Sequence, residues 1–167
     1  MSSRGPQGSQ FGGAGGTDDA FGDGSGTPTI MVIDDSASVR TIVQASFARV
    51  GIPTVAFADG IAAIAALTSR EVPVPDVVLL DIGLPKMDGY EVAQILRSND
   101  ALARTTIIML TARDHVINRL HSRMVGAEAF ISKPFRVSQL VRQVCEVLRY
   151  PLPPAPMPGG GDSSHRL

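Results

Sequence analysis

The chain has 167 residues, of which 44% are apolar and 19% charged, as is typical of one globular domain with extensions at its ends. Its formal net charge of −1 disfavours direct binding to nucleic acid, because proteins of that class usually carry a strongly basic surface. The single cysteine, Cys145, excludes an internal disulfide, and no apolar run is long enough to span a membrane. We therefore expect a cytoplasmic protein without direct contacts to nucleic acid or membrane.

The two ends of the chain differ in composition from the rest. Residues 1–27 are rich in Gly, Ser and Asp, and residues 151–167 contain closely spaced prolines followed by a glycine run. Segments with so few large apolar side chains cannot bury enough surface to offset the entropy that ordering costs. The composition therefore predicts two disordered tails around a folded domain at residues 28–150.

Short apolar runs that contain many β-branched residues predict five strands. Three of the runs are continuous, which is typical of central strands buried on both faces of a parallel sheet. Each of the two weaker runs follows a glycine, Gly51 or Gly126, that can end a preceding helix. The expected strands are Ile30–Ile33, Thr54–Ala58, Val77–Leu80, Ile107–Leu110 and Ala129–Ser132.

Apolar residues at helical spacing follow each expected strand and predict five helices, the first of them capped by Ser36. Strands that alternate with helices in this way favour an α/β fold, a doubly wound five-stranded parallel sheet with helices on both faces. The expected buried stripes are Val39, Ile42, Val43, Phe47 and Val50; Ile61, Ile64 and Ala65; Val92, Ile95 and Leu96; Val116, Leu120 and Met124; and Val137, Leu140, Val141, Val144 and Leu148.

Polar side chains stand at the ends of four expected strands. Asp34 and Asp35 follow the first strand, Asp81 the third, Thr111 the fourth and Lys133 the fifth. Each of these residues alone is usually an ordinary turn or strand residue. Because the carboxyl ends of parallel strands meet at one edge of the sheet, where ligands bind, the combination predicts one shared site.

The residue types in this set indicate phosphoryl chemistry. Neighbouring carboxylates repel one another and favour a bound cation, and Mg²⁺ prefers such oxygen ligands while sharing an oxygen with a phosphoryl group. Lys133 adds a positive charge, and Thr111 offers a hydroxyl donor to a phosphoryl oxygen. Asp81 is then a carboxylate nucleophile that can form an aspartyl phosphate. The sequence therefore predicts a phosphoryl acceptor site that uses Mg²⁺.

Further motifs surround these residues. They are Asp34-Asp35, Asp81 followed by Leu84-Pro85-Lys86-Met87-Asp88-Gly89, Thr111-Ala112, and Gly126-Ala127 leading to Phe130 and Lys133-Pro134-Phe135. With them, the chain from about Thr29 to Tyr150 resembles the response-regulator receiver domains of two-component signalling, which have a flavodoxin-like fold. The resemblance implies that Asp81 is the phosphoacceptor.

The resemblance also implies roles for the residues around Asp81. Asp35 is expected to bind Mg²⁺ directly, Asp34 mostly through water, and Gly83 through its backbone carbonyl. Thr111 and Lys133 are expected to contact the phosphoryl oxygens.

Two further expectations follow from the resemblance. The Lys133-Pro134 peptide bond is expected to be cis, and Phe130 is expected to act as an aromatic switch coupled to Thr111.

A narrower likeness lies in residues 114–135, which resemble receivers of chemosensory-like systems for twitching motility. Arg119 and Arg123 share one helix face at a spacing of four, which makes them candidates for binding an acidic partner. A solvated helix face is an equally open interpretation.

The implied phosphoryl donor is a sensor histidine kinase or a histidine phosphotransfer protein, and the signal is expected to pass to an unidentified protein target. The chain would be a phosphoacceptor rather than a turnover enzyme. A receiver-fold scaffold that docks without phosphorylation stays open as an alternative. A haloacid-dehalogenase-type phosphatase is disfavoured because Gly83 stands where its second Asp is needed, and a nucleotide hydrolase because no phosphate-binding loop motif occurs.

Overall fold

Five parallel strands form one sheet at the centre of the computed structural model, which describes residues 26–112 and 126–151. The order across the sheet is β2-β1-β3-β4-β5, so the predicted doubly wound parallel sheet is confirmed. All five expected strands are present, with ends that differ by up to two residues. The strands are β1 (Ile30–Ile33), β2 (Thr54–Phe57), β3 (Val77–Asp81), β4 (Thr106–Ala112) and β5 (Ala129–Lys133).

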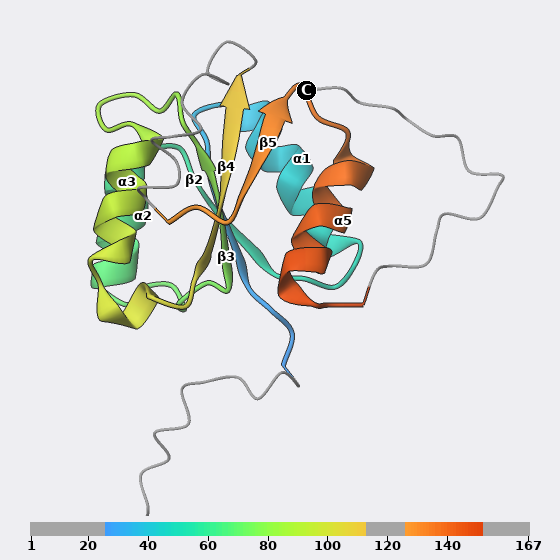
Figure 1. Cartoon of the computed structure of the whole chain (residues 1–167), viewed down its shortest axis with the longest axis horizontal. Helices are drawn as coiled ribbons and strands as arrows, with labels where there is room; N and C mark the ends of the chain where they lie inside the picture. The colour runs from blue at the N-terminus through green and yellow to red at the C-terminus, as the bar shows by residue number, and fades with distance from the viewer. Residues whose placement is uncertain (1–25, 113–125, 152–167) are drawn as a thin grey trace, which may run out of the picture.

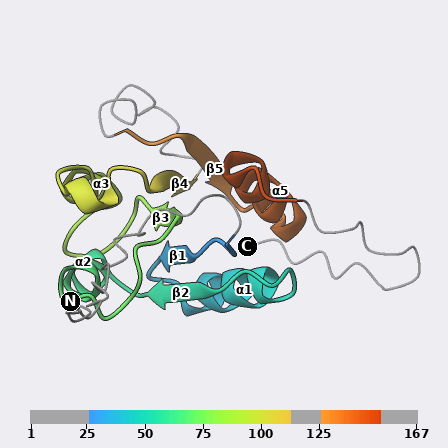
Figure 2. The same ribbon diagram turned by 90° about the horizontal axis from the view of Figure 1, so that it is seen from below.

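Helices cover both faces of the sheet (Figures 1 and 2). The helices α1 (Ala37–Ala48) and α5 (Val137–Leu148) pack on one face, and α2 (Gly60–Thr68) and α3 (Gly89–Arg97) pack on the other. Side chains of the central strands alternate between these two layers. Burial on both faces explains why the strand sequences are continuously apolar.

The described ranges contain four of the five expected α-helices and a short 3₁₀ turn, η1 (Asp100–Leu102). The expected stripe of Val116, Leu120 and Met124 lies outside the described residues. Among the helices that the structure does describe, no segment combines the length and the apolar character that crossing a bilayer requires.

The expected buried stripe of α2 is wrong for two of its three residues, since only Ile64 packs against the core. Ile61 is 49% exposed and Ala65 is also exposed, whereas Ala63 and Ala66 are buried. A Cβ atom on Gly60 would lie 2.3 Å from Val92 Cγ2, so α2 lies so close to α3 that its small residues face inward. Because α2 is almost entirely apolar, its periodicity could not identify this face.

A groove between α2 and α3 results from this orientation. Its lining includes Ile61, Ile64, Ala65 and Met87, together with Ile95 from α3. Ile95 was also expected in a buried stripe and is 38% exposed, whereas Val92 and Leu96 are buried as expected.

The start of α3 packs directly on the end of β3. Asp88 caps the helix by accepting a hydrogen bond from the backbone N–H of Glu91, and the Glu91 side chain accepts one from the N–H of Asp88 in return. A Cβ atom on Gly89 would lie 2.3 Å from the backbone oxygen of Asp81. Only glycine allows this approach, which fixes the turn between β3 and α3.

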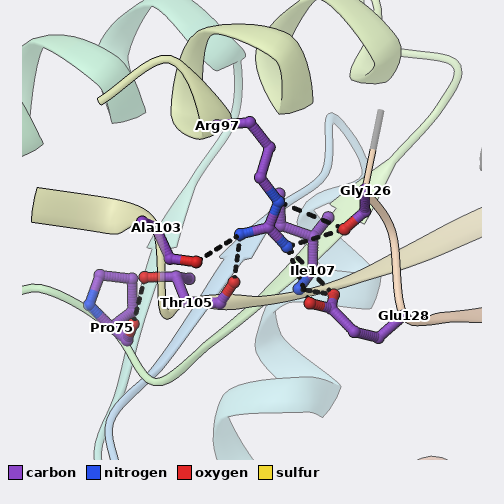
Figure 3. Close-up of polar contacts among 7 residues, drawn as sticks. All are labelled: Pro75, Arg97, Ala103, Thr105, Ile107, Gly126 and Glu128. Atoms are coloured by element: carbon purple, nitrogen blue, oxygen red, sulfur yellow. Dashed lines mark hydrogen bonds and ion pairs between the residues drawn. The ribbon is translucent and has the colours of Figure 1, made fainter. Parts of the chain in front are cut away.

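At the amino-terminal end of the sheet, the side chain of Arg97 connects the end of α3 to the segments that lead into the strands (Figure 3). Arg97 donates hydrogen bonds to the carbonyl oxygens of Thr105, at 2.7 Å, and Gly126, at 2.8 Å, and forms an ion pair with Glu128. Glu128 also accepts a hydrogen bond of 2.7 Å from the N–H of Ile107. This network ties α3 to the starts of β4 and β5.

Candidate functional site

Three carboxylates gather at the carboxyl end of the sheet, the upper end in Figure 1. Asp81 is the last residue of β3, and Asp34 and Asp35 follow the neighbouring strand β1. One oxygen from each of the three carboxylates lies within 4.8 Å of those of the other two. Asp34 and Asp81 are buried, whereas Asp35 is exposed. The pairing of β1 with β3 therefore brings together the three acidic residues that the sequence pattern predicted to be neighbours.

Lys133 reaches this cluster from the last residue of β5, past the end of the intervening strand β4. Its ammonium lies 2.6 Å from Asp34 Oδ2 and 3.1 Å from Asp81 Oδ1. The peptide bond that joins Lys133 to Pro134 is cis, as the resemblance implied. One cation thus bridges two buried carboxylates, one at the end of β3 and one just after β1.

Asp34 is held on both of its carboxylate oxygens. Oδ1 accepts a hydrogen bond of 2.9 Å from the backbone N–H of Ser36, and Oδ2 accepts one from Lys133. Burial raises the pKa of Asp34, against the opposing effects of Lys133 and Ser36. Burial alone would lower the pKa of Lys133, but the hydrogen bonds and charges of Asp34 and Asp81 outweigh it and leave that pKa raised. The two carboxylates therefore stabilise the protonated form of the lysine.

Asp35 differs from Asp34 in its surroundings. Within residues 26–112 and 126–151, its carboxylate makes no hydrogen bond or ion pair. Both oxygens of Asp34 already accept a hydrogen bond from the protein, so Asp35 offers the more accessible ligand. This contrast favours the expected ranking, in which Asp35 binds a metal ion directly and Asp34 mostly through water.

The donor atoms of the cluster fit Mg²⁺. One ammonium cannot neutralise three carboxylates, and hard carboxylate oxygens are the ligands that Mg²⁺ prefers. Gly83 is exposed, and a Cβ atom built on it would lie 3.8 Å from Asp81 Oδ2. Its backbone therefore lies beside the cluster, where the resemblance placed a metal-binding carbonyl.

Thr111 is buried in β4, one residue after Leu110, which pairs with Asp81. Its hydroxyl donates a hydrogen bond of 2.9 Å to the carbonyl oxygen of Ala112. The structure thus places Thr111 at the same edge as the acidic cluster, with its hydroxyl directed to the backbone of its own strand.

Phe130 lies on β5 and pairs with Met109, two residues before Thr111 in β4. Because side chains alternate along a strand, Phe130 and Thr111 face the same side of the sheet as diagonal neighbours. Phe130 is half-buried and packs against the apolar layer under α2 and α3. Arg119 and Arg123, the expected partner-binding residues, lie outside the described residues.

The sequence interpretation missed one residue at this site, Arg40 in α1. Its Nη1 atom donates hydrogen bonds to the backbone carbonyl oxygens of Asp34, at 2.7 Å, and Asp35, at 2.9 Å. The available signal was its position four residues after the N-cap Ser36, because helical side chains point back toward the helix N-terminus.

The comparisons with known proteins agree with this geometry. The family model described as the response regulator receiver domain matches residues 30–145, which include every described residue of the site. Protein PilG of Pseudomonas aeruginosa is 30% identical over 112 residues, which cover 67% of this chain and 81% of PilG. The probable transcriptional regulator ycf27 of Porphyridium aerugineum is 38% identical over 120 residues, but the chain spans about half the length of this and similar regulators.

Solved structures give the same result. A response regulator receiver protein from Burkholderia phymatum superposes with a TM-score of 0.67 at 31% identity, covering 75% of this chain and 98% of that one. The chemotaxis response regulator CheY4 of Vibrio cholerae superposes with a TM-score of 0.65 at 27% identity, covering 73% and 99% of the two chains. The likeness to PilG and CheY4 fits the narrower resemblance to receivers of chemosensory and pilus systems.

Proposed function

The chain belongs to the response-regulator receiver family, whose domains are phosphorylated on an aspartate in two-component signalling, and from this premise we propose that Asp81 is the phosphoacceptor. The observation that carries the proposal is the different surroundings of its two oxygens. Oδ1 is held by Lys133, whereas Oδ2 lies beside Gly83, which has no side chain to cover it. Among the described residues Oδ2 has no protein donor, so we take it as the oxygen that accepts the phosphoryl group.

Mg²⁺ is the metal ion that we propose for this site. Asp35, Asp81 and the carbonyl of Gly83 would hold it directly, and Asp34 through water. When bound, the ion offsets the negative charge of the carboxylates and of the phosphoryl oxygens.

Three residues, Asp81, Lys133 and Thr111, take part in the transfer of the phosphoryl group. Asp81 Oδ2 attacks phosphorus, and a bond to oxygen forms as the bond from phosphorus to the donor's imidazole nitrogen breaks. Lys133 already lies at the other oxygen of Asp81, where its ammonium can pair with a phosphoryl oxygen. The Thr111 hydroxyl would leave the Ala112 carbonyl to donate to the phosphoryl group. The donor would be a sensor histidine kinase or a histidine phosphotransfer protein.

The consequence of transfer is a signal rather than repeated turnover, since the chain itself is the product that carries the phosphoryl group. We propose that it acts through a phosphorylation-dependent contact with a protein partner, with Thr111 and Phe130 as the switch residues and Arg119 and Arg123 as candidate contacts. Direct binding to nucleic acid is not part of this proposal. The cytoplasmic location of the protein stays a prediction.

Acetyl phosphate and intact-mass spectrometry test the proposed acceptor. The wild-type chain is expected to gain one phosphoryl group in the presence of Mg²⁺ and none in the presence of a chelator, because the metal ion offsets the charge that transfer brings together. Asp81→Asn is expected to gain none. Asp100→Asn, which removes an exposed carboxylate from η1, is the matched control and should be phosphorylated like wild type. An undiminished adduct on Asp81→Asn would refute the assignment.

A further inference from the structure

Arg40 joins the helix α1 to the backbone of the acidic turn that precedes it. Its Nη1 atom donates two hydrogen bonds to described residues, one to the Asp34 carbonyl oxygen and one to the Asp35 carbonyl oxygen. These two carbonyls belong to the two peptide units that flank the Cα atom of Asp35. Because a peptide unit is planar, holding the carbonyl of each unit restrains both backbone dihedral angles of Asp35.

The carboxylate of Asp35 depends on this backbone restraint for its direction. Asp34 is oriented by Ser36 and Lys133, which hold its two side-chain oxygens. Asp35 has no such side-chain partner among the described residues, so its Cα–Cβ direction is set by the backbone alone. We propose that Arg40 is a positioning residue that aims the Asp35 carboxylate at the metal ion. This inference rests on the proposed Mg²⁺ site and adds a residue that the site requires.

The position of Arg40 in its helix supports a specific role. It lies near the N-terminus of α1, where the helix dipole disfavours a cation, and the first turn contains no acidic residue to offset it. The carboxylates of the acidic turn just before the helix offset this effect. The two carbonyl hydrogen bonds then hold the guanidinium in place, since a planar guanidinium loses little freedom when it forms several hydrogen bonds.

The two ways in which Arg40 could affect the site, by positioning Asp35 or by its charge alone, predict opposite changes in Mg²⁺ affinity when Arg40 is replaced. The Arg40 cation lies close to the acidic turn, so its charge alone repels Mg²⁺, and removing that charge would tighten metal binding. Loss of positioning would instead weaken binding, because Asp35 would no longer be held toward the ion. The sign of the change in Mg²⁺ affinity thus separates the two explanations.

Titration of the full chain with Mg²⁺, followed by backbone amide chemical shifts, gives the affinity without any need for phosphorylation. Arg40→Met is expected to raise the Kd for Mg²⁺ by about 10-fold, the lower end of the loss typical for residues that support metal ligands. Arg49→Met is the matched control, because it removes the same charge from the other end of α1 and should leave the Kd unchanged. An unchanged or lower Kd for Arg40→Met would overturn the proposal. If Arg40→Met does not fold, Arg40→Gln, whose shorter side chain cannot reach the two carbonyls, takes its place, and an affinity equal to wild type would then overturn it.

A double-mutant cycle shows whether Arg40 acts through Asp35. In an Asp35→Ala background, Arg40→Met is expected to change the Kd by less than about 2-fold, because the carboxylate that it positions is gone. A full 10-fold loss in that background would mean that Arg40 supports the site in another way, and the proposal would be wrong. Failure of the wild-type chain to bind Mg²⁺ would instead refute the proposed metal site, so the two failures can be told apart.

Discussion

Gly83 is a residue whose missing side chain shapes the site. It has no positive φ angle, and a Cβ atom there would lie at ordinary contact distance, 3.8 Å, from Asp81 Oδ2. A larger side chain is therefore compatible with the backbone at this position. Its outer atoms would cover the oxygen that we propose as the phosphoryl acceptor.

The Gly83→Met variant tests whether a larger side chain at this position covers Asp81 Oδ2. We expect a normal fold and a phosphoryl group that persists several times longer than in wild type, because the side chain hinders the water that hydrolyses the aspartyl phosphate. The half-life of the phosphorylated form, followed by intact mass after removal of acetyl phosphate, is the measurement. The Gly83→Ala variant, which adds only a methyl group, should retain a half-life close to wild type. A half-life of the Gly83→Met adduct equal to or shorter than that of wild type would contradict the expectation.

At the scale of elements, the contact of α3 with β3 determines the shape of the loop beside Asp81. Gly89 begins α3, and a Cβ atom on it would meet the backbone oxygen of Asp81 at 2.3 Å and Ile82 Cα at 2.9 Å. Both neighbours are backbone atoms, which cannot move aside as a flexible side chain would. A substitution must therefore displace the helix from the end of the strand.

The Gly89→Ala variant is expected to lose about 2 kcal/mol of unfolding free energy, a typical cost of overpacking. Urea denaturation measures the loss. Gly83→Ala is the control, since its added Cβ meets no atom closer than 3.8 Å and should cost much less. Equal stability of Gly89→Ala and wild type would show that α3 can shift without cost.

For the molecule as a whole, the sheet and most of the site could be predicted from the sequence. Strands such as Val77–Asp81 are buried on both faces, so their apolar runs are continuous, and parallel order then places Asp34, Asp81 and Lys133 at one edge. Contacts between elements could not be predicted in this way. The inward face of α2 depends on the approach of Gly60 to α3. Arg40 donates hydrogen bonds to the turn before its helix, and the periodicity of apolar residues in the helix does not predict that contact.

The central claim is that the whole fold serves to present one carboxylate, that of Asp81, to a phosphoryl donor. Borohydride reduction tests it directly, because an aspartyl phosphate is an activated acyl group that the reagent converts to homoserine, whereas a free carboxylate does not react. Peptide mass spectrometry after phosphorylation with acetyl phosphate and Mg²⁺ then locates the modified residue. We expect homoserine at position 81 and at no other aspartate, and none when Mg²⁺ is chelated. Homoserine at position 34 or 35 with unmodified Asp81 would contradict the account.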